Sequence, residues 1–262
     1  MNLFEIKNLK KHYEIKKGLF SQPTIIKAVN DISFNVKKGE IHSIVGESGC
    51  GKSTTAKLLM TIEKPTEGEI FFQGKDITTF TNEELKEYRK KVQIIFQDPY
   101  SSLNPRWKVG KIIAEPLKLN TDLSDTEIKE KVYAIMKKVG LNDEWYDRYP
   151  HQFSGGQRQR IGIARALILN PEVIICDEPV SALDVSIQAQ VLNLLLDLQE
   201  EFNLTYVFIS HDLGVVEHIS DIITVMYFGD IVESNDVDSI FANPQHDYTK
   251  KLLSAIPSID FK

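Results

Sequence analysis

The sequence predicts an α/β fold with a mostly parallel sheet, an N-terminal antiparallel β part and an inserted helical subdomain. Three observations predict this class. The last third of the chain alternates between apolar strands and helices, a pattern typical of βαβ units. The first third consists mostly of short strands separated by turns, and residues 100–165 have the periodicity of helices. We therefore expect a helical block inserted between two parts of one α/β domain.

Composition excludes several other classes of protein. The 262 residues are 42% apolar and 26% charged, and 31 basic residues against 37 acidic ones give a net charge of −6. The longest apolar run is five residues, Val132 to Met136, whereas a membrane-spanning helix needs about 20. The acidic balance disfavours a dedicated nucleic-acid binder, and two cysteines indicate no disulfide framework. With no signal-peptide pattern at the N-terminus, a cytosolic location is expected.

Local signals place the individual elements. Apolar residues alternate with polar ones over 32–36, as in a half-buried strand. Ser124 and Glu127 form a capping box ahead of a helix over 128–139, which Gly140 ends. Further strands are expected at 41–45, 68–72, 92–96, 172–176, 205–210 and 221–228, and further helices at 55–62, 186–202 and 212–219.

These elements predict a single domain over residues 1–262. Its core is expected at 1–98 and 166–240, its helical subdomain at 99–165 and a C-terminal extension at 241–262.

A glycine-rich segment, GESGCGKST at Gly46–Thr54, follows the strand expected at 41–45. It matches G-x-x-x-x-G-K-[ST], in which backbone N–H groups at a helix N-terminus surround phosphate oxygens. Lys52 would reach the β- and γ-phosphates and Ser53 would ligate Mg²⁺, whereas Cys50 is interpreted as a small filler residue. The strand before it and the helix after it disfavour the alternative, an ordinary Gly-rich turn. The expected nucleotide-binding residues are Gly46, Ser48, Gly49, Cys50, Gly51, Lys52, Ser53 and Thr54.

Two acidic residues, Asp177 and Glu178, follow the apolar strand expected at 172–176. Ligands of open α/β sheets bind at the carboxyl ends of strands, and adjacent residues on an extended chain point to opposite sides. Asp177 would therefore hold Mg²⁺, directly or through water, and Glu178 would polarise the attacking water. The alternative, two acidic residues at the start of an ordinary loop, is disfavoured because the chain also contains the phosphate-binding segment.

A second candidate anion site begins another helix, at Ser154-Gly155-Gly156-Gln157. Its N–H groups and helix dipole would favour an anion, although taken alone the segment also fits a plain capped helix. One nucleotide does not need two such sites on one chain. We therefore expect this segment to serve an ATP that is held by another subunit.

In this combination and order, the motifs resemble those of the ATP-binding subunits of ABC transporters, over nearly the whole chain. The resemblance covers a Walker A motif (46–53), a Q-loop (Gln97), a signature motif (153–157), a Walker B motif (173–178), a D-loop (181–184) and a switch histidine (His211). It implies a P-loop NTPase fold of the ABC type.

The resemblance implies a role for each matched residue. Catalytic roles fall on Glu178, His211 and Gln97. Mg²⁺ ligation falls on Ser53, Gln97 and Asp177. Contacts to nucleotide fall on Ser154, Gly155, Gly156, Gln157 and Asp184. Three of these residues have a plainer alternative role. Gln97 could be a solvated loop residue and His211 a structural histidine. Asp184 could be an ordinary N-cap, which is compatible with the D-loop role.

Tyr13 is the best candidate to stack on the adenine ring. It lies 33 residues before Gly46, which is far for the family, and the segment Lys16–Thr24 looks like an insertion that explains the gap. The alternative is a strand-end tyrosine.

Finer matches resemble the oligopeptide, dipeptide and nickel uptake group of this family. They lie at 96–106, 148–160, 176–190 and 243–257. The sequences KKGLF at 16–20 and EHISD at 217–221 resemble the second, F-type ATPase of such systems. Some members bind an iron–sulfur cluster through cysteines near the C-terminus. Because the last cysteine here is Cys176, no such cluster is expected.

The resemblance thus implies an ATPase subunit that energises uptake of di- or oligopeptides across the cytoplasmic membrane, with nickel or a metal chelate as the alternative cargo. ATP and Mg²⁺ are the implied cofactors. The implied partners are a paralogous ATPase in a head-to-tail heterodimer, two transmembrane permeases and an extracellular substrate-binding protein, with no nucleic acid. The subunit would lie peripherally on the cytoplasmic face of the membrane.

Three rival functions fit less well. A soluble ABC ATPase of DNA repair or translation usually needs tandem cassettes or long coiled coils. A phosphotransferase would not need the SGGQ segment or His211. A binding-only subunit would not need Lys52, Glu178 and His211 together.

Overall fold

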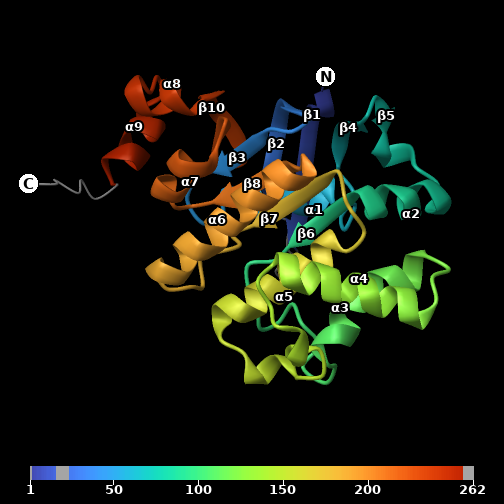
Figure 1. The fold of residues 1–262 in the computed structure, drawn as a ribbon. Helices are drawn as coiled ribbons and strands as arrows, with labels where there is room; N and C mark the ends of the chain where they lie inside the picture. Colours follow the sequence, from blue (N-terminus) through green and yellow to red (C-terminus); the bar gives the residue numbers. More distant parts are fainter. Residues whose placement is uncertain (1, 16–23, 256–262) are drawn as a thin grey trace, which may run out of the picture. The chain divides into compact units, whose positions relative to one another are not determined.

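The computed structural model describes residues 2–15 and 24–255, which divide into two compact units (Figure 1). The first unit is drawn from Met1–Leu85 and Thr205–Lys262, and the second from Lys86–Leu204. The KKGLF segment at 16–20 lies outside the described residues, as does all of the expected insertion except Thr24. The boundaries expected between core and helical subdomain differ from this division and stay a prediction.

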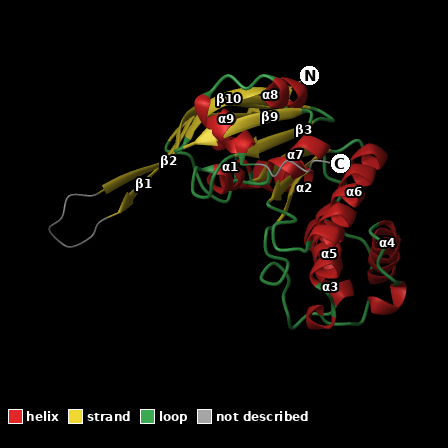
Figure 2. Ribbon diagram, turned by 90° about the vertical axis from the view of Figure 1, so that its left-hand side faces the viewer, coloured by secondary structure: helices red, strands yellow, loops and turns green. Residues whose placement is uncertain are grey.

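The first unit contains an antiparallel sheet with the strand order β2-β1-β4-β5. Its strands are β1 (Asn2–Ile15), β2 (Thr24–Lys37), β4 (Glu67–Phe72) and β5 (Lys75–Asp76). Strands β1 and β2 form a long antiparallel pair in which Phe4 lies opposite Val36 and Tyr13 opposite Ile26 (Figure 2). This sheet confirms the antiparallel β part that the sequence predicted.

A second set of strands in the first unit has the order β10-β9-β3-β8. These are β3 (Ile41–Val45), β8 (Thr205–Ser210), β9 (Ile222–Tyr227) and β10 (Asp230–Asp236). Strand β3 runs parallel to both neighbours, so that Val45 lies beside Ser210 of β8 and Val225 of β9. The segments that follow β3 and β8 therefore leave the strands at the same edge.

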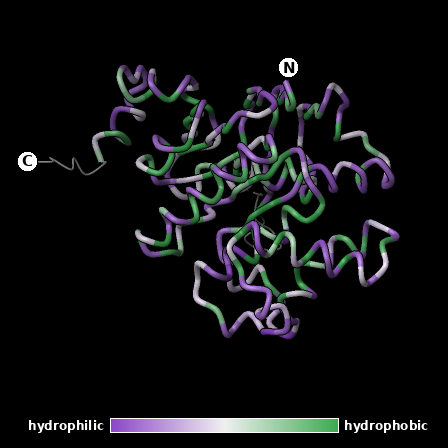
Figure 3. Tube along the Cα trace, in the orientation of Figure 1, coloured by the Kyte–Doolittle hydropathy of each residue, from purple (hydrophilic) through white to green (hydrophobic). Residues whose placement is uncertain are grey.

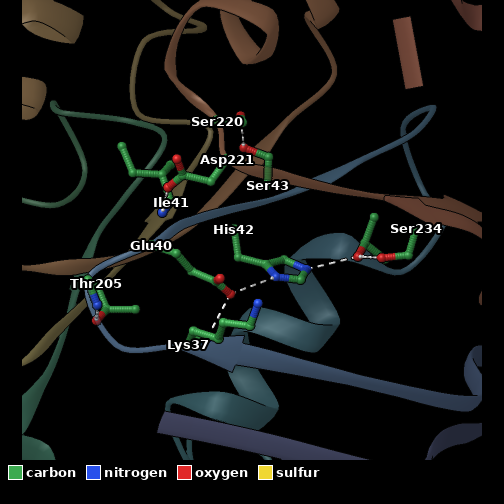
Figure 4. A network of polar contacts seen from close by, with 11 residues as sticks. Lys37, Glu40, Ile41, His42, Ser43, Thr205, Ser220, Asp221 and Ser234 are labelled. Atoms are coloured by element: carbon green, nitrogen blue, oxygen red, sulfur yellow. Dashed lines mark hydrogen bonds and ion pairs between the residues drawn. The ribbon is translucent and has the colours of Figure 1, made fainter. Parts of the chain in front are cut away.

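The opposite, amino-terminal end of β3 is fixed by a network of polar contacts (Figure 4). The Glu40 carboxylate accepts a hydrogen bond from the Lys37 N–H over 2.6 Å, and the Asp221 carboxylate accepts one from the Ile41 N–H over 2.8 Å. His42 is 1% exposed and its Nε2 lies 2.8 Å from the Thr224 hydroxyl. These contacts give partners to the Ile41 N–H and to Nε2 of His42, which would otherwise be costly to bury.

Helices and short turns complete the first unit. They are α1 (Lys52–Leu59), the 3-10 turn η1 (Ile77–Thr79), α7 (Leu213–Ile219), α8 (Val237–Ala242) and α9 (Asp247–Ser254). Helix α1 begins and ends three residues earlier than the expected stretch 55–62, and Thr61, beyond its C-terminal end, adopts a left-handed φ of 53°. Helices α8 and α9 lie beside β10 in both ribbon views (Figures 1 and 2).

The second unit combines a parallel strand pair with the helical segment that the sequence predicted. Strand β6 (Val92–Ile95) pairs in parallel with β7 (Val173–Asp177), with Ile95 beside Cys176. The helices and turns are α3 (Val109–Asn120), α4 (Asp125–Lys138), η2 (Asp143–Trp145), η3 (Pro150–Gln152), α5 (Gly155–Leu167) and α6 (Val185–Phe202). Helix α2 (Asn82–Lys91) crosses the boundary between the units.

Capping and amphipathic patterning explain the helices of this second unit. The predicted capping box of Ser124 and Glu127 is present, and Gly140 ends the helix with a φ of 73°. Hydrophobic and hydrophilic residues alternate along α4 (Figure 3), and its buried residues Ile128, Val132, Ile135 and Met136 recur at helical spacing. Among the described residues, no helix is both long and apolar enough to cross a membrane.

Candidate functional site

The glycine-rich segment joins β3 to α1 at the carboxyl edge of the first unit's parallel strands. Its tip, residues 47–49, is exposed, whereas Gly46, Cys50 and Gly51 are buried. Helix α1 begins directly after Gly51. The N–H groups of its first turn lack helical partners and give this end a partial positive charge, which is the geometry that binds phosphate.

Gly46 and Gly51 are required by close approaches of other backbone segments. A Cβ atom on Gly46 would lie 2.2 Å from the Met226 carbonyl oxygen, and one on Gly51 would lie 2.2 Å from the Ala28 carbonyl oxygen. Both glycines also adopt positive φ, 152° and 115°. Any side chain at either position would therefore displace backbone, so the loop keeps its shape only with glycine at both.

Lys52 is 4% exposed and lies folded against the loop. Its ammonium donates to the carbonyl oxygens of Gly46, over 2.7 Å, and Glu47, over 3.0 Å. The loop thus holds the Lys52 ammonium beside its own backbone. The N-terminus of α1, which carries a partial positive charge, lies at the same place. Burial raises the pKa of the neighbouring Cys50 thiol, although Lys52 opposes the shift, and the thiol therefore stays protonated and suits the predicted filler role.

Tyr13 lies close to the first turn of α1. Its hydroxyl forms a hydrogen bond with the Glu63 carboxylate and also interacts with the Thr54 side chain. The Lys11 ammonium lies 5.1 Å from the ring centroid. Burial, followed by the contact with Glu63, raises the pKa of Tyr13. Adenine stacking by this ring stays a prediction, and the contact with Thr54 places the ring beside the predicted phosphate-binding helix.

His211 follows β8 at the same edge as Gly46, which follows β3. The register of Val45 beside Ser210 establishes this, since each residue immediately precedes one of the two. Asp212 caps α7 by accepting from the N–H groups of Gly214 and Val215. The histidine is exposed and is held between a strand end and a capped helix, and its switch role stays a prediction.

In the second unit, Gln97 and Glu178 are in direct contact. Gln97 follows β6 and Glu178 follows β7, and the parallel register of these strands brings both to one edge. The Gln97 side-chain amide donates a hydrogen bond of 2.9 Å to the Glu178 carboxylate. A donor at this distance orients the carboxylate. The structure thus joins two of the three residues predicted to be catalytic.

The backbone at Glu178 differs from the sequence prediction. The separate roles of Asp177 and Glu178 were argued from an extended chain, but Glu178 adopts a left-handed φ of 48°, so that argument is wrong. The Ser181 hydroxyl donates to the Glu178 carbonyl oxygen over 3.1 Å and supports the turn. Strained backbone of this kind is common at functional sites, and here it aims the Glu178 side chain independently of the strand's alternation.

The segment Ser154–Gln157 forms the capped start of α5. Ser154 and Gln157 make a capping box, with the Gln157 N–H donating to the Ser154 hydroxyl over 3.3 Å. A Cβ on Gly155 would lie 3.2 Å from the Leu183 side chain, and one on Gly156 would lie 2.4 Å from the Ile187 side chain. The two glycines therefore allow close packing within this unit, and their predicted contact with nucleotide stays a prediction.

Asp184 is the N-cap of α6, which is one of the two roles predicted for it. Its carboxylate accepts from the Ser186 hydroxyl over 2.7 Å and from the Ile187 N–H over 3.0 Å, and these bonds lower its pKa. The side-chain amide of Gln188 braces the same loop, because it donates to the carbonyl oxygens of Val180 and Leu183. Sequence reasoning missed Gln188, and only its place one turn into the helix could have indicated it.

The chain is similar to a well-populated family of known proteins. It matches the ABC transporter family over residues 29–181 and the C-terminal region of oligopeptide/dipeptide transporters over 232–262. The dipeptide transport ATP-binding protein DppF of Haemophilus influenzae is 58% identical over 96% of this chain and 77% of its own. The oligopeptide transport ATP-binding protein AppF of Bacillus subtilis is 54% identical over 97% of this chain and 78% of its own.

Solved structures show the same likeness in three dimensions. A dimeric ATP-binding cassette in a post-hydrolysis state, bound to ADP and Pi, has a TM-score of 0.79 at 31% identity. The likeness covers 89% of this chain and 98% of that one. CbiO1 from Clostridium perfringens, described as part of an ABC transporter complex, has the same TM-score at 28% identity and covers 98% of this chain and 96% of its own.

Proposed function

Since the chain belongs to the ABC transporter family and is one of its ATP-hydrolysing subunits, we propose that it energises the import of dipeptides or oligopeptides. The observation that carries the choice of cargo is the agreement of two matches. Relatives more than 50% identical over nearly the whole chain are peptide transport proteins, and residues 232–262 match the C-terminal region of such transporters. Nickel or a metal chelate is the other cargo that the sequence resemblance allowed.

ATP would be held by the glycine-rich loop. Gly46 and Gly51 let the backbone turn without a side chain in the way, so that the N–H groups of residues 49–54 can donate to phosphate oxygens. The Lys52 ammonium already lies against the loop, and it would exchange its two carbonyl partners for the β- and γ-phosphates. Tyr13 would stack on the adenine beside Thr54.

The three predicted magnesium ligands fit Mg²⁺ by their chemistry. This cation prefers oxygen ligands and is usually held by one or two carboxylates together with substrate phosphates. Ser53 offers a hydroxyl oxygen, Asp177 a carboxylate and Gln97 an amide oxygen. The bound cation would neutralise charge that develops on the phosphates.

Glu178 would act as the general base for the attacking water. Its carboxylate is oriented by the Gln97 amide, and a base must be fixed within hydrogen-bond reach of the proton that it takes. His211 would contact the γ-phosphate region. The chain's own residues would thus bind the nucleotide, orient the water and accept its proton.

A head-to-tail pair with a paralogous ATPase would complete each site. The capped N-terminus at Ser154–Gln157 would contact the ATP held by the partner chain, and Asp184 would lie near the same interface. The pair would sit on the cytoplasmic face of the membrane, against two permeases that receive peptide from an extracellular binding protein. Closure of the pair on ATP and its reopening after hydrolysis would drive the permeases.

Uptake by cells tests the cargo directly. In the source organism, cells that lack this gene should lose uptake of a radiolabelled dipeptide, and the wild-type gene should restore it. Glu178→Gln should not restore uptake, although its protein level should match the wild type by immunoblot. Normal peptide uptake with loss of ⁶³Ni²⁺ uptake would contradict the peptide proposal in favour of the metal cargo.

A further inference from the structure

The C-terminal helix α9 forms a hydrogen bond with the phosphate-binding loop through the side chain of Tyr248. The Glu47 N–H donates a hydrogen bond of 2.9 Å to the hydroxyl oxygen of Tyr248. These residues lie 201 positions apart in the sequence, yet both belong to the first unit. The carbonyl group of Glu47 is also bound, because its oxygen accepts a hydrogen bond from the Lys52 ammonium over 3.0 Å.

Tyr248 is held firmly in this position. It is 6% exposed, and its ring packs against the ring of Tyr227 with centroids 4.1 Å apart. The N-terminal end of α9 is anchored to β10, where the Glu233 carboxylate accepts from the N–H groups of Gln245 and His246 over 2.8 and 3.0 Å. The hydroxyl is therefore presented to the loop by a fixed ring on a fixed helix.

The loop makes a second contact with the same region of the chain. The Gly229 N–H, in the turn between β9 and β10, donates to the Cys50 carbonyl oxygen over 2.9 Å. Glu47 and Cys50 thus each have one backbone group bound by the segment that runs from β9 to α9. These bonds lie at the two ends of the exposed tip of the loop.

From this geometry we propose that Tyr248 is a positioning residue for ATP binding: its hydroxyl holds the phosphate-binding loop in the shape that accepts nucleotide, and it couples helix α9 to the nucleotide site. The inference rests on the proposed role of the loop in binding ATP. A ligand binds an already ordered loop at a smaller cost in free energy than a loop that it must first order. The hydroxyl therefore acts on ATP affinity and leaves the chemical step unchanged.

Coupling of this kind is reciprocal. If docking of α9 favours ATP binding, then ATP binding favours docking of α9 by the same factor. ATP should therefore slow hydrogen exchange at the backbone amides of residues 249–254, although in the proposal none of them touches nucleotide. A purely structural role for Tyr248 would give no such ATP dependence.

Tyr248→Phe removes only the hydroxyl and keeps the ring on Tyr227. We expect the dissociation constant for ATP with Mg²⁺, measured on the full chain by calorimetric titration, to rise about three- to ten-fold, as for loss of one ordinary hydrogen bond. The KM for ATP should rise by a similar factor with kcat unchanged. The ATP-dependent slowing of exchange in α9 should disappear, while the melting temperature without nucleotide stays close to that of the wild type.

Lys251→Ala is the matched control. Its ammonium lies 3.9 Å from the Glu47 carboxylate, but both side chains are more than half exposed, and such pairs contribute little. We expect wild-type affinity and wild-type exchange for this variant.

Wild-type ATP affinity in Tyr248→Phe would overturn the inference, and so would ATP-dependent protection of α9 that survives the substitution. Equal weakening by Lys251→Ala would also overturn it, because charge and not the hydroxyl would then carry the coupling. Failure of the wild-type chain to bind ATP through this loop, as judged with Lys52→Met, would instead contradict the proposed function.

Discussion

The Gln97 side-chain amide donates a hydrogen bond of 2.9 Å to the Glu178 carboxylate, across 81 positions of sequence. The contact exists because β6 and β7 run parallel with Ile95 beside Cys176, so the two residues that leave these strands meet at one edge. An isolated carboxylate at a strand end could adopt several orientations. One that is bound by a neighbouring amide is held for a specific proton transfer, which the account of hydrolysis requires.

Gln97→Ala should reduce hydrolysis because Glu178 loses the donor that orients it. Loss of a hydrogen bond to a charged group corresponds to about 1.5–3 kcal/mol, so kcat should fall roughly ten- to one-hundred-fold while ATP affinity changes little. Gln93→Ala is the matched control, since the amide of this β6 glutamine donates to the Arg89 carbonyl instead. Phosphate release and nucleotide titration check both variants. A fall in kcat that simply adds to that of Glu178→Gln in the double variant would contradict a joint role.

Lys52→Met should weaken ATP binding at least ten-fold, because it removes a charged donor to the phosphates while keeping an unbranched side chain. Lys57→Met, on the same helix but at an exposed position, should bind ATP as the wild type does. Fluorescence titration measures the affinity, and melting without nucleotide reports any loosening of the loop through the lost Gly46 and Glu47 contacts. Unchanged affinity in Lys52→Met would refute its placement at the phosphates.

Ser154→Asp tests whether the start of α5 faces an ATP held by a partner chain. Aspartate and asparagine both cap helices as well as serine does, but aspartate alone puts a negative charge where phosphate is expected. Turnover by the ATPase pair should therefore be lost in Ser154→Asp and largely kept in Ser154→Asn, with ATP binding to the isolated chain unchanged in both. A substitution at Gly156 would be uninformative, because any Cβ there would press on Ile187. Equal turnover in the two Ser154 variants would exclude a nearby phosphate.

Stability should depend on pH through Glu40. Burial raises the pKa of this carboxyl, but the His42 imidazole 3.5 Å away and the hydrogen bond from the Lys37 N–H outweigh that effect, so that the pKa lies below its ordinary value. A depressed pKa stabilises the fold above the unfolded value and loses that effect as pH falls through the folded value. Glu40→Gln should therefore lower the free energy of unfolding at pH 7, on the order of 1 kcal/mol.

The difference in free energy of unfolding between Glu40→Gln and the wild type should shrink below about pH 4.5, where the carboxyl group of the unfolded chain takes up its proton. Denaturant unfolding at pH 7 and pH 4 measures it. Glu69→Gln, at an exposed position of β4, serves as control and should have little effect at either pH. A loss of stability in Glu40→Gln that is the same at both pH values would rule out this electrostatic origin.

Local sequence signals predicted the parts of the site that depend on local structure. The glycine-rich loop before α1, the capped helix start at Ser154 and the N-cap at Asp184 each need only residues a few positions apart, and the structure contains all three. The pairing of Gln97 with Glu178 could be anticipated only as far as two strand ends of one parallel sheet. Their hydrogen bond depends on the register of β6 and β7, which no short motif encodes.

Other features had no signal in the sequence. The left-handed backbone at Glu178 is unexpected for a residue with a Cβ atom, and it is imposed by the turn that Ser181 supports. The contact of Tyr248 with Glu47 joins residues 201 positions apart, and its tyrosine lies in a helix whose pattern indicates only an amphipathic surface. Close packing against Leu183 and Ile187 explains Gly155 and Gly156 without reference to any ligand.

Phosphate release by Glu178→Gln tests the central claim, that this chain hydrolyses ATP with Glu178 as its base. The substitution keeps the size of the side chain but removes its ability to accept a proton, and general-base assistance contributes about 10²–10⁴-fold in rate. With the paralogous ATPase present and its own base substituted in the same way, hydrolysis should fall by that factor. ATP affinity should hold or increase, and an ATP-bound pair should accumulate on size-exclusion chromatography with Mg²⁺. Hydrolysis near the wild-type rate in that doubly substituted pair would contradict the account and leave the proton to another group, such as Asp177 or a water held by Gln97 and His211.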